Sequence, residues 1–216
     1  MDDYTKLLEK ALKVYIGEDI LSSLKANGLN ALNLEYKRSF ATFLCIDIIT
    51  IHFADEILIP ETVMARMNYY YHTIIEQIII HNGIINNING DSILAVFDHN
   101  TSDSDLACKA ALECIKMNHN ICEKNNCSIS LGIGITTGPT LVGNIGSPLK
   151  LQYSYIGDTV NLASRVQSLT KPLKENIIIT ETTKNLLTGS YDIHEIETIF
   201  HMKGSNNSLK LYGLNA

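Results

Sequence analysis

The chain has 216 residues, a formal net charge of −6, and 17 lysine and arginine residues that form no cluster. This balance argues against a nucleic acid or an anionic membrane surface as the main partner, although a local site could still bind a small anion. The length fits one domain with an appendage. No apolar run approaches the length of a membrane span and the acidic start does not resemble a signal peptide, so we expect a soluble, cytoplasmic protein.

The cysteine and histidine residues show no metal-binding spacing. Five cysteines, an odd number without a C-x-x-C pair, fall mostly in apolar stretches, and seven histidines are scattered along the chain. We therefore expect reduced, mainly buried thiols and no zinc site.

The first part of the chain predicts a helical leader and then a strand. Apolar residues recur with helical spacing over about residues 4–24, with a break at Gly17, which predicts a short leader over residues 1–30 rather than a domain. A compact apolar strand, about Ala41–Ile46, is expected to end at Asp47. An acidic residue at the end of an otherwise apolar strand stands out by its context.

A helix, a hairpin and a second helix are expected next. Apolar residues keep helical spacing over Glu61–His81, between a proline at the start and an Asn-Gly pair at the stop. The hairpin covers about Ile84–Ile88 and Ser92–Phe97, and its turn is Gly90-Asp91. Taken alone, the aspartate is a common turn former. The second helix, Asp103–Lys124, has an acidic first turn and an apolar face.

The second half of the chain predicts further strands around one helix. The glycine-rich segments SISLGIGITTG and LVGNIG predict a strand pair, and GDTVNLASRVQSL predicts a helix with Asp158 as N-cap. NIIITETTKNLL predicts a strand followed by a short helix, and two final strands lie near Ile193–Met202 and Ser208–Gly213. This order is best satisfied by an α+β fold, a ferredoxin-like mixed sheet with helices on one face.

Asp47 and Asp91 are the acidic residues most suited to chemistry. In a ferredoxin-like sheet the first strand and the first hairpin are usually neighbours, so the two carboxylates could converge. Paired carboxylates can bind Mg²⁺ or Mn²⁺, and the bound ion can then coordinate a phosphate. A pair of aspartates is not specific by itself.

Four segments occur in one order along the chain: FLCIDIITI, GIINNINGDSILAVF, LGIGITTGPTLVGNIGSPLKLQYSYIGDTVNLASRVQSLT and HMKG. Together they resemble the catalytic domain of the class III nucleotidyl cyclases, the adenylyl and guanylyl cyclase family, over residues 37–214. The resemblance implies attack of the ribose 3′-hydroxyl of a nucleoside triphosphate on the α-phosphorus, which yields a 3′,5′-cyclic nucleotide and pyrophosphate. It also implies two divalent metal ions per site, Mg²⁺ or Mn²⁺, and an obligatory homodimer with composite active sites.

The resemblance assigns roles to individual residues. Asp47 and Asp91 match the two metal-binding aspartates, and the backbone of Ile48 lies next to the metals. Asn161 matches the asparagine that orients the ribose, and Arg165 matches the arginine that stabilises charge on the phosphorus. The last two are four residues apart, so both project from one face of a helix.

Three further positions concern the phosphates and the base. Lys203 in HMKG matches the lysine that pairs with the terminal phosphates, although the following GSNNS departs from the family's K-G-K-G pattern. The two positions that select the purine hold Asn87 and Ser154, which match neither the adenylyl nor the guanylyl pair. Ser154 resembles the threonine of some adenylyl cyclases and favours ATP slightly. A free-standing domain with these replacements also resembles the bacterial pyrimidine cyclases, which make cyclic CMP or cyclic UMP as an antiphage signal.

Plainer alternatives exist for these features. Arg165 and Lys203 could be solvated charges and Asn161 an exposed helix residue. The domain could bind a nucleotide without turning it over, and the leader helix could pack on the core or extend a dimer interface.

Overall fold

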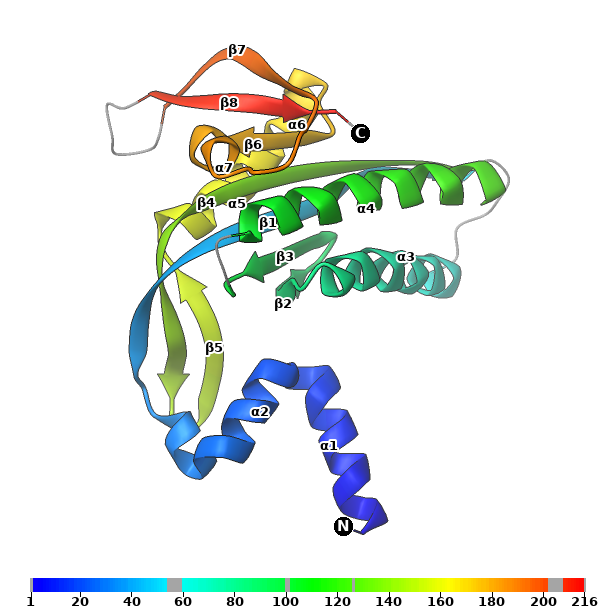
Figure 1. Ribbon diagram of the computed structural model, residues 1–216. Coiled ribbons are helices and arrows are strands. Elements are labelled where there is room, and N and C mark those ends of the chain that lie inside the picture. Colours follow the sequence, from blue (N-terminus) through cyan, green and yellow to red (C-terminus); the bar gives the residue numbers. More distant parts are fainter. Residues whose placement is uncertain (1, 54–59, 100–101, 126, 202–207, 216) are drawn as a thin grey trace. The chain divides into compact units, whose positions relative to one another are not determined.

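The protein is described by a computed structural model that covers residues 2–53, 60–99, 102–125, 127–201 and 208–215 (Figure 1). The strands are β1 (Tyr36–Phe53), β2 (Ile84–Asn89), β3 (Ser92–Phe97), β4 (Cys127–Ser147), β5 (Lys150–Ile156), β6 (Ile177–Thr180), β7 (Ile193–His201) and β8 (Ser208–Leu214). The helices are α1 (Asp3–Ile16), α2 (Glu18–Asn27), the 3₁₀ helix η1 (Gly28–Leu32), α3 (Pro60–Ile80), α4 (Asp103–Asn125), α5 (Asp158–Ser168), α6 (Thr170–Leu173) and α7 (Glu181–Asn185).

The strands form one mixed sheet in the order β2-β3-β1-β4-β6-β8-β7, and β5 pairs with β4. β4 and β6 run parallel, whereas β1 with β3 and β6 with β8 are antiparallel. The chain order β1-α3-β2-β3-α4-β4, with the sheet order β4-β1-β3-β2, is a ferredoxin-like unit. The predicted fold class is therefore confirmed.

The chain divides into two compact units, which are described separately. The first comprises residues 1–39 and 141–156, and the second comprises residues 40–140 and 157–216. The second unit holds most of the sheet and its covering helices.

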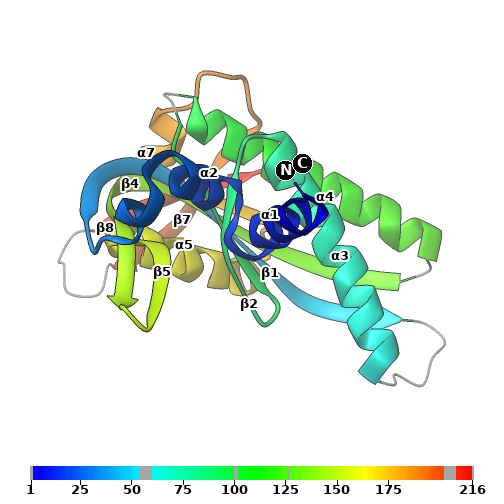
Figure 2. The ribbon, with the colours of Figure 1, turned by 90° about the horizontal axis from the view of Figure 1, so that it is seen from below.

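The core of the second unit lies mainly between one face of the sheet and the helices α3 and α4. These two helices lie side by side (Figures 1 and 2) and bury Ile74, Ile78 and Ala111. Helix α5 covers the other face, because its Val166 packs on Ile178 of β6, whose neighbours along the strand face the main core. The expectation of helices on one face only was thus wrong for α5.

Two strands extend further than the sequence predicted. β1 does not end at Asp47 but continues to Phe53, because the isoleucine-rich segment after Asp47 favours extended backbone. SISLGIGITTG and LVGNIG are not partners but consecutive parts of the single strand β4. The actual partner of the LVGNIG part is β5, which was not predicted, with Gly143 opposite Ser154.

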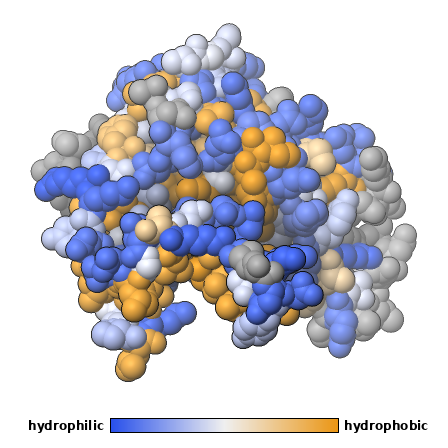
Figure 3. Space-filling model, turned by 60° about the horizontal axis from the view of Figure 1, so that its bottom comes forward, coloured by the Kyte–Doolittle hydropathy of each residue, from blue (hydrophilic) through white to orange (hydrophobic). Residues whose placement is uncertain are grey.

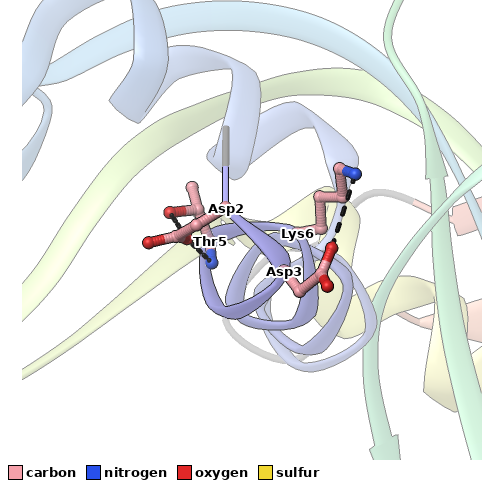
Figure 4. Close-up of polar contacts among 4 residues, drawn as sticks. All are labelled: Asp2, Asp3, Thr5 and Lys6. Carbon is pink, nitrogen blue, oxygen red and sulfur yellow. Dashed lines mark hydrogen bonds and ion pairs between the residues drawn. The ribbon is translucent and has the colours of Figure 1, made fainter.

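The first unit begins with two short helices. Asp2 caps α1 through its carboxylate, which accepts hydrogen bonds from the backbone N–H of Thr5 at 2.7 Å and from its hydroxyl at 2.6 Å (Figure 4). Gly17, with φ of 90°, separates α1 from α2, as the sequence predicted. None of the residues of α1, all of which the structure describes, is buried.

Large apolar side chains reach the surface of both units, and Figure 3 shows several of them on one face. In the first unit they include Tyr15 on α1 and Leu149, which is 97% exposed between β4 and β5. No helix in the described ranges combines the length and apolar character needed to cross a membrane.

Four of the five cysteines have side chains that the structure describes, and these four are free thiols. Cys45, Cys108 and Cys114 are buried, and Cys122 is half-buried. The prediction of mainly buried thiols is confirmed for these four.

Candidate active site

Two carboxylates meet where β1 passes the tip of the β2–β3 hairpin. Asp47 lies opposite Ser92, the first residue of β3, so Asp91 in the turn is next to it. The backbone N–H of Ile48 donates a hydrogen bond of 3.3 Å to the main-chain carbonyl of Asp91. The sequence prediction that the two aspartates and Ile48 lie together therefore agrees with the structure.

Local sequence explains why both carboxylates are presented on this side. The side chains of Ile46 and Ile48 are buried in the main core, so the strand alternation turns Asp47 to the opposite face. The turn needs a residue with positive φ, and Gly90 supplies it at 62°. The hydroxyl of Tyr71 on α3 donates a hydrogen bond to the carbonyl of Gly90 and braces the turn.

The carboxylate pair perturbs the ionisation of its neighbourhood. Burial raises the pKa of Asp47, and the charge and close contact of Asp91 raise it further, whereas hydrogen bonds from Gln167 and the Ile48 backbone lower it. The pKa of Tyr71 is raised by burial and by both carboxylates. The site thus concentrates negative charge that a bound cation would offset.

Gln167 is a contact that sequence reasoning missed. Its side-chain amide Nε2 donates a hydrogen bond of 3.4 Å to Oδ2 of Asp47, and the residue is only 7% exposed. The helical spacing could have indicated that Gln167 is buried, because it is four residues after Ala163 and therefore lies on the same, apolar face of the helix.

Asn161 and Arg165 lie on the other side of α5. Both are exposed, whereas the buried residues of α5 are Thr159, Ala163, Val166 and Gln167. The two residues are one turn apart and share a face of the helix, as predicted. That face points away from the sheet. Within one chain the structure does not bring them to Asp47 and Asp91.

The N-terminus of α5 differs from the sequence prediction. The N-cap is Gly157, without a side-chain hydrogen bond, and Asp158 is the first residue of the helix. The backbone of Gly157 has φ of 159°, which is extended. The helix therefore begins one residue earlier than an Asp158 cap would imply, and Asp158 adds negative charge to its first turn.

The two positions expected to read the base fall in different units. Asn87 is exposed on β2, opposite Leu94 and beside an irregularity of the β2–β3 register. Ser154 is half-buried on β5 in the first unit. Lys203 lies outside the described residues.

The carboxylate pair is not part of a larger cluster of metal-ligating side chains among the described residues. The described residues contain no group of three or more histidine, cysteine, aspartate or glutamate side chains that could hold a metal. A metal at this hairpin would therefore depend on the two carboxylates and on main-chain oxygens, the hard ligands that Mg²⁺ and Mn²⁺ prefer.

A ferredoxin-like sheet with an acidic pair at its first hairpin is a frame suited to metal-dependent phosphate chemistry. The particular family follows from comparison with known proteins. Residues 38–216 match the family model described as the adenylate and guanylate cyclase catalytic domain. The chain belongs to this family.

Known proteins similar to the chain carry related names. A terminal-differentiation-specific adenylate cyclase of Dictyostelium discoideum is 30% identical over 180 residues, which are 76% of this chain but 8% of that protein. A bacterial light-regulated adenylyl cyclase has a similar fold, with a TM-score of 0.82 and 22% identity over 98% of this chain and 62% of that one. The guanylyl cyclase Cya2 has a TM-score of 0.67 and 26% identity over 82% and 92% of the two chains.

Proposed function

We propose that the protein is a nucleotidyl cyclase that converts a nucleoside triphosphate into a 3′,5′-cyclic nucleotide and pyrophosphate. The observation that carries the proposal is the adjacent pair Asp47 and Asp91 in a chain of the cyclase catalytic-domain family. The chain spans only 8% of its Dictyostelium relative, so the activity is inferred for this domain from its own residues.

The carboxylate pair fits divalent metal ions. The pKa of Asp47 is raised first by burial and then by the negative charge of Asp91, and a divalent cation bound between the two carboxylates would offset both effects. Asp47, Asp91 and the main-chain carbonyl of Ile48 would hold Mg²⁺ or Mn²⁺. Two such ions, when bound, would supply activation of the 3′-hydroxyl and charge neutralisation on the triphosphate.

The substrate is proposed to lie between two copies of the chain. Asn161 and Arg165 face away from the carboxylates of their own subunit, so a second copy is needed to complete the site. In the homodimer Asn161 would orient the ribose and Arg165 would stabilise the charge that develops on the α-phosphoryl group. Lys203 would bind the terminal phosphates. A monomer would then be inactive.

For the base we propose ATP. The support is the adenylate cyclase name of the Dictyostelium relative and the small hydroxyl of Ser154, whereas the similarity to a guanylyl cyclase weighs against it. Asn87 and Ser154 would contact the base, and neither is the usual purine-selecting residue. Cyclisation of CTP or UTP, as in antiphage signalling, is the alternative outcome.

The domain organisation is part of the proposal. Residues 37–214 would form the catalytic domain and residues 1–30 a leader. The exposed apolar side chains of α1, such as Tyr4, Val14 and Tyr15, would be covered in the dimer. Removal of residues 1–30, followed by measurement of the dimer dissociation constant, tests this part.

The reaction is tested by incubating the full chain separately with ATP, GTP, CTP and UTP in Mn²⁺ and identifying the products by mass spectrometry. We expect a cyclic nucleotide and pyrophosphate, with cyclic AMP in largest yield. Asp47→Ala and Asp91→Ala should each abolish the product, and Arg165→Ala should slow it by about 10³-fold.

Two results would contradict the proposal. Undiminished turnover in both aspartate variants would remove the metal-binding assignment. Nucleotide binding without any product from the four triphosphates would leave a binding module instead of an enzyme.

A further inference from the structure

Gln167, on the buried face of α5, contacts Asp47 of the carboxylate pair. Its amide Nε2 donates to Oδ2 of Asp47 at 3.4 Å, and only 7% of the residue is exposed. The exposed face of the same helix carries Asn161 and Arg165. Gln167 is therefore the link between a proposed metal ligand and the helix that carries the proposed transition-state residues.

The approach of α5 to the sheet depends on two glycines of β4. A Cβ atom added to Gly134 would lie 2.4 Å from the backbone nitrogen of Gln167 and 2.5 Å from the carbonyl oxygen of Ala163. A Cβ atom on Gly132 would lie 2.9 Å from Nε2 of Gln167. Because these positions lack side chains, the helix lies directly on β4 and its glutamine reaches over that strand to β1.

A hydrogen bond also holds the main chain of Gln167 in place. The hydroxyl of Thr170 donates a hydrogen bond of 2.7 Å to the main-chain carbonyl of Gln167, and Thr170 is 1% exposed. The close approach to β4 and this bond restrict the backbone from which the amide extends. Its donor group is thus held in place before any ligand arrives.

We propose that Gln167 is a positioning residue for Asp47 and thereby sets the affinity of the carboxylate pair for a divalent cation. This inference rests on the proposed function, because it takes Asp47 as a metal ligand. The amide occupies one acceptor position of Oδ2 and restricts rotation of the carboxylate. Residues that hydrogen-bond to metal ligands in this way commonly change metal affinity by 10-fold or more when they are removed.

The neutral charge of Gln167 suits this task. A glutamate would bring a third negative charge against two that already repel each other. A lysine or arginine would neutralise Asp47 and compete with the cation. An amide donates a hydrogen bond without either effect.

The test measures Mn²⁺ binding without nucleotide, by electron paramagnetic resonance of the free ion, on the full chain. Gln167→Met keeps the length and apolar bulk of the side chain but removes the donor, and Gln167→Asn keeps an amide that is too short to reach. We expect both variants to raise the Mn²⁺ dissociation constant about 10-fold. The Mn²⁺ concentration for half-maximal turnover should rise by a similar factor.

The matched control is Thr136→Val. Thr136 is buried on β4 and donates a hydrogen bond of 2.9 Å to the carbonyl of Thr159 on α5, so it anchors the same helix without touching Asp47. Its removal should leave Mn²⁺ affinity within about 2-fold of the unmodified protein. Thermal unfolding of each variant identifies any that is not folded.

The outcomes separate this inference from the proposed function. Unchanged Mn²⁺ affinity in folded Gln167→Met or Gln167→Asn would overturn the positioning role, as would an equal loss in Thr136→Val. Asp47→Ala is measured in parallel, and if that change leaves Mn²⁺ binding intact, the metal assignment itself fails. Loss of binding in Asp47→Ala with normal binding in the glutamine variants would overturn only the inference.

Discussion

Gly134→Ala is expected to push α5 off the sheet. The new methyl group would lie 2.4 Å from the backbone nitrogen and 2.8 Å from the Cα atom of Gln167, and 2.5 Å from the carbonyl oxygen of Ala163. These are backbone atoms of a helix, so no side-chain rotation can relieve the contacts. Overpacking of this kind costs about 3 kcal/mol. The lower backbone entropy of alanine in the unfolded chain offsets up to about 1 kcal/mol of that.

The net loss is thus about 2 kcal/mol, which lowers the melting temperature of a chain of this length by about 6 °C. Circular dichroism during heating measures it. Gly138→Ala is the matched control on the same strand. The three atoms nearest to its added methyl group all belong to the side chain of Thr159, the closest at 2.8 Å, rather than to the backbone of a helix, and we expect a loss below about 1 kcal/mol. A Gly134→Ala protein that melts at or above the temperature of the unmodified chain would refute the close approach of α5 to β4.

Other parts of the second unit give two further predictions. The carboxylate of Asp105, which is 4% exposed, accepts four hydrogen bonds from residues 188–191. Asp105→Ala should therefore lower the free energy of unfolding, measured in urea, by about 3 kcal/mol. A loss near zero would contradict this. Burial opposes the ionisation of Asp105, but the hydrogen bonds outweigh burial and hold its pKa below the ordinary 3.8. The stabilisation from these hydrogen bonds is therefore present above about pH 4 and is lost as the pH falls through the pKa of Asp105 in the folded protein. Burial raises the pKa of Cys108 and Cys114 to about 12, so a thiol reagent at about pH 8 should label them only after unfolding, and rapid labelling of the native chain would contradict their burial.

The regular elements were predictable where the sequence pattern is local. The helix predicted over Asp103–Lys124 is α4, Asp103–Asn125, and the hairpin has its turn at Gly90-Asp91 as expected. Helical spacing of apolar residues and a glycine turn act over a few residues, so one sequence reveals them. The same holds for the break at Gly17.

The long strands were not predictable from local patterns. β4 continues through Gly138 and Pro139, residues that usually end a strand. It continues because its two parts pair with different partners, β6 near Ile133 and β5 from Leu141 onward. Such pairings depend on residues far away in the sequence. The sequence prediction therefore placed a strand end at the glycine and proline, where the strand in fact continues.

For the candidate site, the sequence could indicate residue types but not which of them meet within one chain. Asp47 and Asp91 come together because β1 and β3 are neighbours, which the fold class implies. Gln167 was missed because its role depends on how closely α5 lies on β4, which is a three-dimensional fact. The exposure of Asn161 and Arg165 follows from the apolar face of α5 and could have been read from the helical spacing.

We propose that the two half-sites on one chain are completed by a second copy. The direct measurement mixes Asp47→Ala with Arg165→Ala, each dimeric and each nearly inactive alone, allows subunits to exchange, and follows cyclic nucleotide formation. Random pairing places one intact site in half of the dimers, so activity should recover to about a quarter of that of the unmodified protein. No recovery, with subunit exchange verified by differently tagged copies, would contradict the composite site.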